Sequence, residues 1–96
     1  MLSVQIASKV AQAIVNHQRD IIGPLAFEQA GKVPGIVVSQ STVSLQESLP
    51  DPANTLVGLV HKYEELFGQT SVEVCKDAVK ELGSAISSKD LPAILQ

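Results

Sequence analysis

The sequence predicts an all-α fold, with two pseudo-repeated helical hairpins packed as a small bundle and an irregular central linker. An amphipathic stretch twice runs into a glycine, and a second apolar stretch begins at once after it. Within these stretches apolar residues recur at intervals of three and four, which is the period of an α-helix. Because 45% of the residues are hydrophobic and only 3% are aromatic, the core must be built from Val, Ile, Leu and Ala. We expect one domain over 1–96.

The first hairpin is expected at about 3–33. Ser3 is the expected N-cap of its first helix, and Gly23 is the expected left-handed stop. Pro24 favours the first turn of a second helix, which we expect to continue to about Lys32.

The segment at about 34–50 is the hardest to interpret. The β-branched run at 36–38 and the alternation at 43–46 favour a small β-hairpin that turns at 39–41. A capping box at 44–47 instead favours a short helix. We favour an ordered linker, because a two-stranded ribbon is marginal without something to pack on.

The second hairpin and a short terminal helix are expected at about 51–96. Asp51 is the expected N-cap of its first helix, and Gly68 stops that helix. A capping box at 70–73 is expected to open the next helix, which Gly83 ends.

The two hairpins match when the chain is shifted by 45 positions, the distance from Gly23 to Gly68. Identical residues then coincide three times, at Val15 and Val60, Gly23 and Gly68, and Glu28 and Glu73. This pattern favours an internal repeat. Because neither hairpin can cover its apolar face alone, we expect the two to pack on each other with approximate two-fold pseudosymmetry.

The residues expected in the core or at an interaction seam are apolar and lie on the helical stripes: Val10, Ile14, Ile21, Leu56, Leu59, Val60, Tyr63 and Phe67. A small domain with only 18% charged residues has difficulty hiding all of its aliphatic surface inside one chain. We therefore predict a non-catalytic interaction or assembly module with a regulatory role, which forms a homodimer or docks on another protein. The alternative is a carrier or sensor that binds a small apolar ligand between the hairpins.

No pattern in the sequence indicates an enzyme, a metal site or a cofactor, and we expect none of these. His17 lies three residues before Asp20, and His61 three before Glu64, but a zinc site needs further ligands. Surface hydrogen bonds or ion pairs on a helix are the favoured interpretation of these pairs. Cys75 is expected to be a small buried core residue.

Charge and composition exclude several classes of partner. The net charge is −3 and the seven basic residues are scattered, which does not fit nucleic-acid binding. The sequence has neither a membrane span nor a basic amphipathic face, so we expect a soluble protein. A single cysteine favours a reducing cytoplasm. The stretch 1–19 lacks acidic residues and resembles an organellar presequence, but a structural first helix is favoured.

The two turns at 22–26 and 67–71 resemble a short helical module found at the ends of some bacterial signalling proteins, including kinases. In that module a Gly-Pro-x-Ala turn opens a helix, and the first turn here reads Ile-Gly-Pro-Leu-Ala. The second turn differs, with Gln69 in place of the proline and Ser71 in place of the alanine. The layout of 82–92 is also similar. This resemblance implies a non-catalytic regulatory or assembly role.

Overall fold

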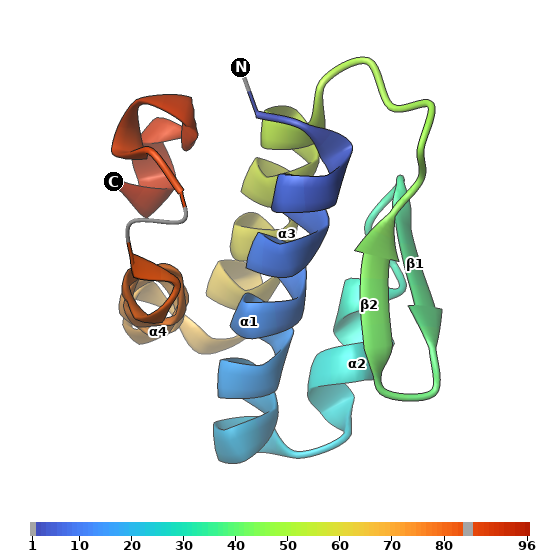
Figure 1. Cartoon of the computed structure of the whole chain (residues 1–96). Helices are drawn as coiled ribbons and strands as arrows, with labels where there is room; N and C mark the ends of the chain where they lie inside the picture. Colours follow the sequence, from blue (N-terminus) through green and yellow to red (C-terminus); the bar gives the residue numbers. More distant parts are fainter. Residues whose placement is uncertain (1, 84–85) are drawn as a thin grey trace.

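The computed structural model describes residues 2–83 and 86–96 and is mostly helical (Figure 1). In chain order it contains α1 (Val4–Ile22), α2 (Leu25–Ala30), β1 (Ile36–Ser39), β2 (Thr42–Leu45), α3 (Pro52–Phe67), α4 (Gln69–Glu81) and two single 3₁₀ turns, η2 (Ser88–Asp90) and η3 (Ala93–Leu95). The predicted helical character is confirmed, but the fold is not purely all-α.

The two long helices begin at the expected caps. Ser3 Oγ accepts a hydrogen bond from the Ile6 amide at 3.2 Å, and Asp51 Oδ1 accepts one from the Asn54 amide at 3.2 Å. Each bond satisfies an amide that the helix itself leaves without a partner. α1 and α3 then run side by side in the same direction, so both helices end toward the same side of the molecule (Figure 1).

The prediction of an irregular linker is wrong, because β1 and β2 form an antiparallel hairpin. Its register pairs Ile36 with Leu45 and Ser39 with Thr42, and the short helix considered at 44–47 is absent from this segment. The hairpin is stable because α1 covers it. The Val43 and Leu45 side chains are buried.

Two side chains of α1 also accept hydrogen bonds from backbone amides on the outer edge of β2. The Val43 amide donates to Gln12 Oε1 at 2.7 Å, and the Leu45 amide donates to Ser8 Oγ at 2.9 Å. The ribbon therefore has the packing partner that a two-stranded sheet requires.

The start of α4 also differs from the prediction. The helix begins at Gln69, directly after Gly68, so Thr70 lies inside the first turn and is not the N-cap. The Gly68 carbonyl accepts from the Ser71 amide at 3.0 Å, while the Glu73 carboxylate accepts from Gln69 Nε2 at 3.4 Å. The short terminal helix that we expected consists of the two 3₁₀ turns.

One hydrophobic core joins the helices, the β-hairpin and the C-terminal turns. Its largest completely buried apolar side chains come from α1, α3 and α4: Tyr63, Ile14, Leu56, Leu59, Val10, Val15, Val60 and Cys75. Leu91 and Leu95 extend the core at the C-terminal end. None of the helices in the described ranges combines the length and the apolarity needed to cross a membrane.

Candidate functional site

The eight residues predicted for the core or seam fall into two groups. Six have no exposed surface: Val10, Ile14, Leu56, Leu59, Val60 and Tyr63. The other two are exposed, Ile21 by 63% and Phe67 by 41%. A partner can therefore reach only Ile21 and Phe67 without unfolding the chain.

Most of the large exposed apolar side chains gather where α1 and α3 end. Ile21 and Phe67 are joined there by Leu66, which is 49% exposed, and by Leu25, which is 37% exposed. We call these four residues the apolar end. Leu66 and Leu25 were missing from the predicted seam. For Leu66 the signal was available, because Leu66 is the residue that follows Ile21 by 45 positions.

The two turns that create the apolar end have the same backbone. Gly23 has φ 70° and ψ −152°, and Gly68 has φ 77° and ψ −165°. The Gly23 amide donates to the Arg19 carbonyl at 2.8 Å, and the Gly68 amide donates to the Glu64 carbonyl at 2.8 Å. Only glycine adopts this backbone region readily. Each glycine thus stops its helix directly after an apolar residue and redirects the chain.

Two buried side-chain hydrogen bonds follow the same shift of 45 residues. Gln18 Nε2 of α1 donates to the Ser71 carbonyl in the first turn of α4 at 3.1 Å. Tyr63 Oη of α3 donates to the Ala26 carbonyl in the first turn of α2 at 2.7 Å. Each long helix therefore holds the start of the second helix of the other hairpin, and this positions both turns beside the apolar end.

Burial controls the ionisation of the two acidic groups near these contacts. Burial raises the pKa of the Tyr63 hydroxyl far above its ordinary value, and the neighbouring Cys75 raises it further. Burial also raises the pKa of the Cys75 thiol to about 11, although the Gln18 amide, 3.5 Å from Cys75 Sγ, lowers it in part. Cys75 is thus a protonated thiol at neutral pH and a weak nucleophile.

A small pocket opens at the apolar end between the two hairpins. Its volume is about 90 Å³, and its lining comes from both hairpins: Gln18, Ile21, Ile22, Phe67, Thr70, Ser71 and Val74. Pockets for drug-sized ligands usually hold about 300–1,000 Å³. This pocket is therefore smaller than the pockets that usually hold drug-sized ligands.

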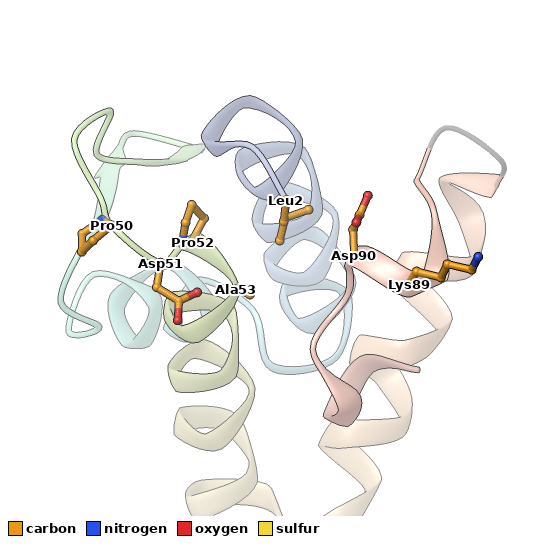
Figure 2. Close-up of a pocket in the computed structure, with 7 residues that line it drawn as sticks. All are labelled: Leu2, Pro50, Asp51, Pro52, Ala53, Lys89 and Asp90. Carbon is orange, nitrogen blue, oxygen red and sulfur yellow. The ribbon is translucent and has the colours of Figure 1, made fainter.

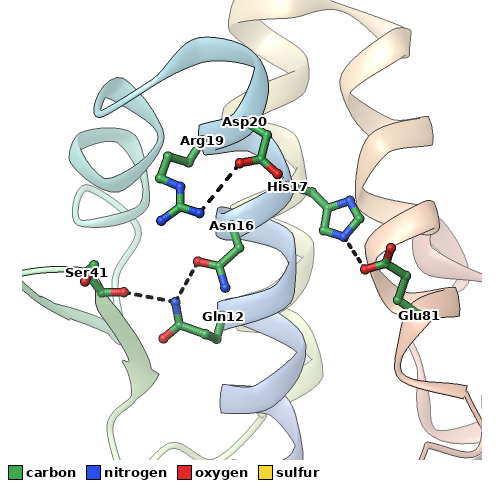
Figure 3. A network of polar contacts seen from close by, with 7 residues as sticks. All are labelled: Gln12, Asn16, His17, Arg19, Asp20, Ser41 and Glu81. Carbon is green, nitrogen blue, oxygen red and sulfur yellow. Dashed lines mark hydrogen bonds and ion pairs between the residues drawn. The ribbon is translucent and has the colours of Figure 1, made fainter.

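The polar side chains of α1 make structural contacts (Figure 3). His17 Nε2 lies 2.6 Å from Glu81 Oε2, which links α1 to α4. Asp20 Oδ1 lies 3.6 Å from Arg19 Nη2. His17 thus contacts Glu81 and Asp20 contacts Arg19, in place of the His17–Asp20 pair considered from the sequence. In residues 2–83 and 86–96, no group of three or more His, Cys, Asp or Glu side chains is arranged to hold a metal ion.

A larger pocket lies at the opposite end, where α1 and α3 begin (Figure 2). Its volume is about 340 Å³, and Leu2, Pro50, Asp51, Pro52, Ala53, Lys89 and Asp90 line it. The Asp51 carboxylate already caps α3, and the Lys89 side chain points away from the other lining residues (Figure 2). The polar groups therefore do not converge on a ligand, and we place the candidate site at the apolar end.

No family model matches the chain, and neither a curated protein nor a solved structure matches it. The candidate site consequently rests on the geometry of the chain.

Proposed function

We propose that this protein is a non-catalytic assembly module with a regulatory role, and that it self-associates through the apolar end. The observation that supports this function is the gathering of four large exposed apolar side chains, Ile21, Leu25, Leu66 and Phe67, at one end of a small chain. Apolar patches of this kind, surrounded by polar residues, mark protein-interaction surfaces. The role implied by the resemblance of 22–26 to modules of bacterial signalling proteins agrees with this proposal.

The charges around the apolar end favour a second copy of the chain as the partner. Arg19 and Glu64 occupy equivalent positions in the last turns of α1 and α3, and they carry opposite charges. In a two-fold, end-to-end dimer, α1 of one copy meets α3 of the other. Arg19 then lies near Glu64 of the second copy, and the same contact occurs twice because the interface is self-complementary.

The size of the pocket favours assembly over the transport of a ligand. The space of about 90 Å³ between the hairpins accepts a side chain such as Phe67 or Leu66 of the second copy. Insertion of an apolar side chain would bury part of the surface that the isolated chain leaves in water, which supplies the driving force for association.

Sedimentation equilibrium of the wild type and of Leu66→Glu tests this function. Because Leu66 is half exposed, the variant should keep the helical circular dichroism of the wild type. The buried charge should weaken end-to-end association by at least about tenfold, so that the variant forms smaller species. Gln5→Glu, which adds the same charge at an exposed site elsewhere on α1, is the control and should associate like the wild type.

Charge reversal tests the arrangement within this dimer. Arg19→Glu alone and Glu64→Arg alone should each weaken association, while the double variant should restore it, because the opposite charges again face each other. Unchanged association of Leu66→Glu would overturn the proposed function.

A further inference from the structure

The turn between α3 and α4 consists of one residue. Gly68 alone separates Phe67, the last residue of α3, from Gln69, the first residue of α4. With φ 77° and ψ −165°, Gly68 changes the direction of the chain, so that α4 packs against α1 and α3 (Figure 1). A change of this one residue to helical φ and ψ would join α3 and α4 into a single helix over 52–81.

A joined helix would form backbone hydrogen bonds that the turn does not form. The last carbonyls of α3 and the first amides of α4 have no partner within their own helices. In a joined helix the amides of 69–72 would pair with the carbonyls of 65–68, because α-helical bonds join residues four apart. Against this gain, glycine is a poor residue inside a helix. The segment therefore has two allowed conformations, which we call closed and open.

The first hairpin cannot open in this way, because a proline follows its glycine. Pro24 stands where the second hairpin has Gln69. Inside a helix, a proline has no amide to donate, and its ring clashes with the carbonyl four residues earlier. The two turns are otherwise alike, since each glycine carbonyl accepts a hydrogen bond of 3.0 Å from the amide three residues later. The difference at this one position leaves only the second turn able to open.

The large apolar residues before Gly68 are exposed in the closed chain. Leu66 is 49% exposed and Phe67 is 41% exposed, although both lie in the last turn of α3. They follow the buried Tyr63 by three and four positions, so they continue the apolar face of α3 toward the turn. The closed chain thus leaves apolar surface in water directly beside the residue that can open.

We propose that two copies of this protein open at Gly68 and exchange α4. Each α4, with the chain that follows it, packs on α1 and α3 of the other copy. The exchanged helix makes the same contacts as in the closed chain, because the surface that receives it is unchanged. Exchange of an identical element is a low-cost route to a dimer, and a short hinge favours it.

The exchange also accounts for the exposed residues at the hinge. Each α4 begins where the α4 of the other copy began in the closed chain, so the two Gly68 residues lie close together. Leu66 and Phe67 of both copies gather at this point. Their burial removes apolar surface from water, which favours the exchanged dimer over two closed chains.

Three side-chain contacts between α1 and α4 pass from one chain to the other in the exchange. Gln18 Nε2 donates to the Ser71 carbonyl at 3.1 Å and lies 3.5 Å from Cys75 Sγ. His17 Nε2 lies 2.6 Å from Glu81 Oε2. In a closed chain all three contacts are intramolecular, whereas in the exchanged dimer all three are intermolecular. They therefore distinguish the exchanged dimer from every arrangement of closed chains.

This exchange goes beyond the proposed function, because end-to-end contact at the apolar end leaves both chains closed. The two kinds of dimer also differ in rate. Before exchange, α4 must detach from a core in which Cys75 and Ala78 have no exposed surface. The exchanged dimer therefore forms slowly and persists after dilution, as assemblies with a large unfolding barrier do.

The experiment compares the two turns by alanine substitution. Wild type, Gly68→Ala and Gly23→Ala are refolded from urea at about 1 mM, and the dimer is measured by sedimentation velocity. Gly68→Ala should raise the association constant at least about tenfold, because opening relieves the strain of a positive φ at alanine. Gly23→Ala carries the same strain before Pro24 and is the control, which should dimerise no more than the wild type. In dilute solution, where both variants are monomeric, they should lose equal stability.

Gln69→Pro tests the exchange in the opposite direction. It gives the second turn the Gly-Pro pair of the first, and proline fits the first position of α4. The variant should keep the closed fold, measured by circular dichroism. It should form none of the dimer that persists after dilution, since its hinge can no longer become helical.

Mixed isotope labelling detects the exchange directly. Labelled and unlabelled Gly68→Ala chains are refolded together, and isotope-filtered nuclear Overhauser effects are recorded on the dimer. Effects between the Gln18 side-chain amide and the Cys75 β protons should connect different chains. In Gln69→Pro the same effects should arise only within one chain.

Three results would overturn the exchange. These are Gln18–Cys75 contacts confined to one chain in the Gly68→Ala dimer, a Gly68→Ala chain that dimerises no better than Gly23→Ala, and a persistent dimer of Gln69→Pro equal to that of the wild type. If Gly68→Ala fails to fold, the labelling and dilution measurements on the wild type and Gln69→Pro decide the question.

The same data separate this exchange from the proposed function. If the intermolecular Gln18–Cys75 contacts are absent while Leu66→Glu weakens the association of the wild type, the exchange fails and the proposed function stands. If these contacts are present while Gln69→Pro, which associates only as a closed chain, stays monomeric, the exchange stands and the end-to-end contact fails.

Discussion

The two hairpins have the same turn but different second helices. Gly23 and Gly68 share their φ and ψ and the same amide hydrogen bond four residues back. After the turn, α2 has 6 residues and α4 has 13. α4 packs along both α1 and α3, whereas α2 is too short to cover α1, and the β-hairpin covers the remaining side (Figure 1). The turn is thus set by local sequence, while the length of the helix after it decides what else must pack on the core.

The largest expected effect on stability comes from replacing Tyr63. At the equivalent positions of the two hairpins, the buried side-chain donor is Gln18 in α1 and Tyr63 in α3. Tyr63 has no exposed surface, so Tyr63→Ala should lower the free energy of unfolding by about 3–5 kcal/mol, as other large-to-small changes of buried aromatic residues do. Tyr63→Phe keeps the ring and loses only the bond to the Ala26 carbonyl, so it should cost about 1 kcal/mol. Urea unfolding followed by far-ultraviolet circular dichroism measures both. Equal losses for the two variants would show that the hydrogen bond, and not the ring, stabilises this contact.

The shared turn predicts equal effects in the two hairpins. Nothing lies within 4 Å of a methyl group placed at Gly23 or Gly68, so only the backbone conformation opposes alanine there. Gly23→Ala and Gly68→Ala should each lower the free energy of unfolding by about 1–3 kcal/mol. Gly31→Ala is the control, because Gly31 has φ −65° and room for a methyl group, and it should be neutral or slightly stabilising. A cost at only one of the two turns would contradict their equivalence.

The smallest expected effect is a change of stability at alkaline pH that Cys75 causes. Ala30, its counterpart 45 residues earlier, has no ionisable side chain. Burial raises the pKa of the Cys75 thiol from about 9 to about 11, so the folded state favours the neutral thiol. This contribution is complete below the unfolded pKa and is lost as the pH rises from 9 to 11. Near pH 9.5 the loss should stay below about 1 kcal/mol, because the unfolded thiol is only partly ionised there.

Cys75→Ala makes the second hairpin like the first at this position. The variant should keep its stability up to about pH 10, where Tyr63 begins to ionise in the unfolded chain. Thermal unfolding at pH 8, 9.5 and 10.5 measures the difference between the two proteins. If the wild type and Cys75→Ala lose stability equally as the pH rises, ionisation of Cys75 is not the cause of that loss.

The helix ends could be predicted because each depends on residues within about four positions. Ser3 and Asp51 cap amides three residues ahead, and Gly23 and Gly68 each end a helix through their own backbone. The capping box at 70–73 failed because Gly68 already supplied the turn that begins α4 at Gln69. A local signal thus predicts an element unless a neighbouring local signal is stronger.

The candidate site was only partly predictable. Ile21 and Phe67 were in the predicted seam together with six residues that the structure buries, because all eight lie on apolar helical stripes. Periodicity identifies which face of a helix is apolar, but it does not show where along that face the covering elements stop. The shift of 45 positions from Ile21 could have pointed to Leu66, but only the packing of α2 shows that Leu25 stays exposed.

By itself the sequence determined the helical character of the chain, the four main helices and the glycine turns, since these depend on periodicity and on hydrogen bonds between near neighbours. The tertiary structure alone decided that residues 36–45 form a hairpin, since Ser8 and Gln12 of α1 bond to β2 over more than 30 positions of sequence. It also decided which apolar residues remain in water. Burial depends on how far α2 and α4 reach across the ends of α1 and α3, and that distance is a property of the packed chain.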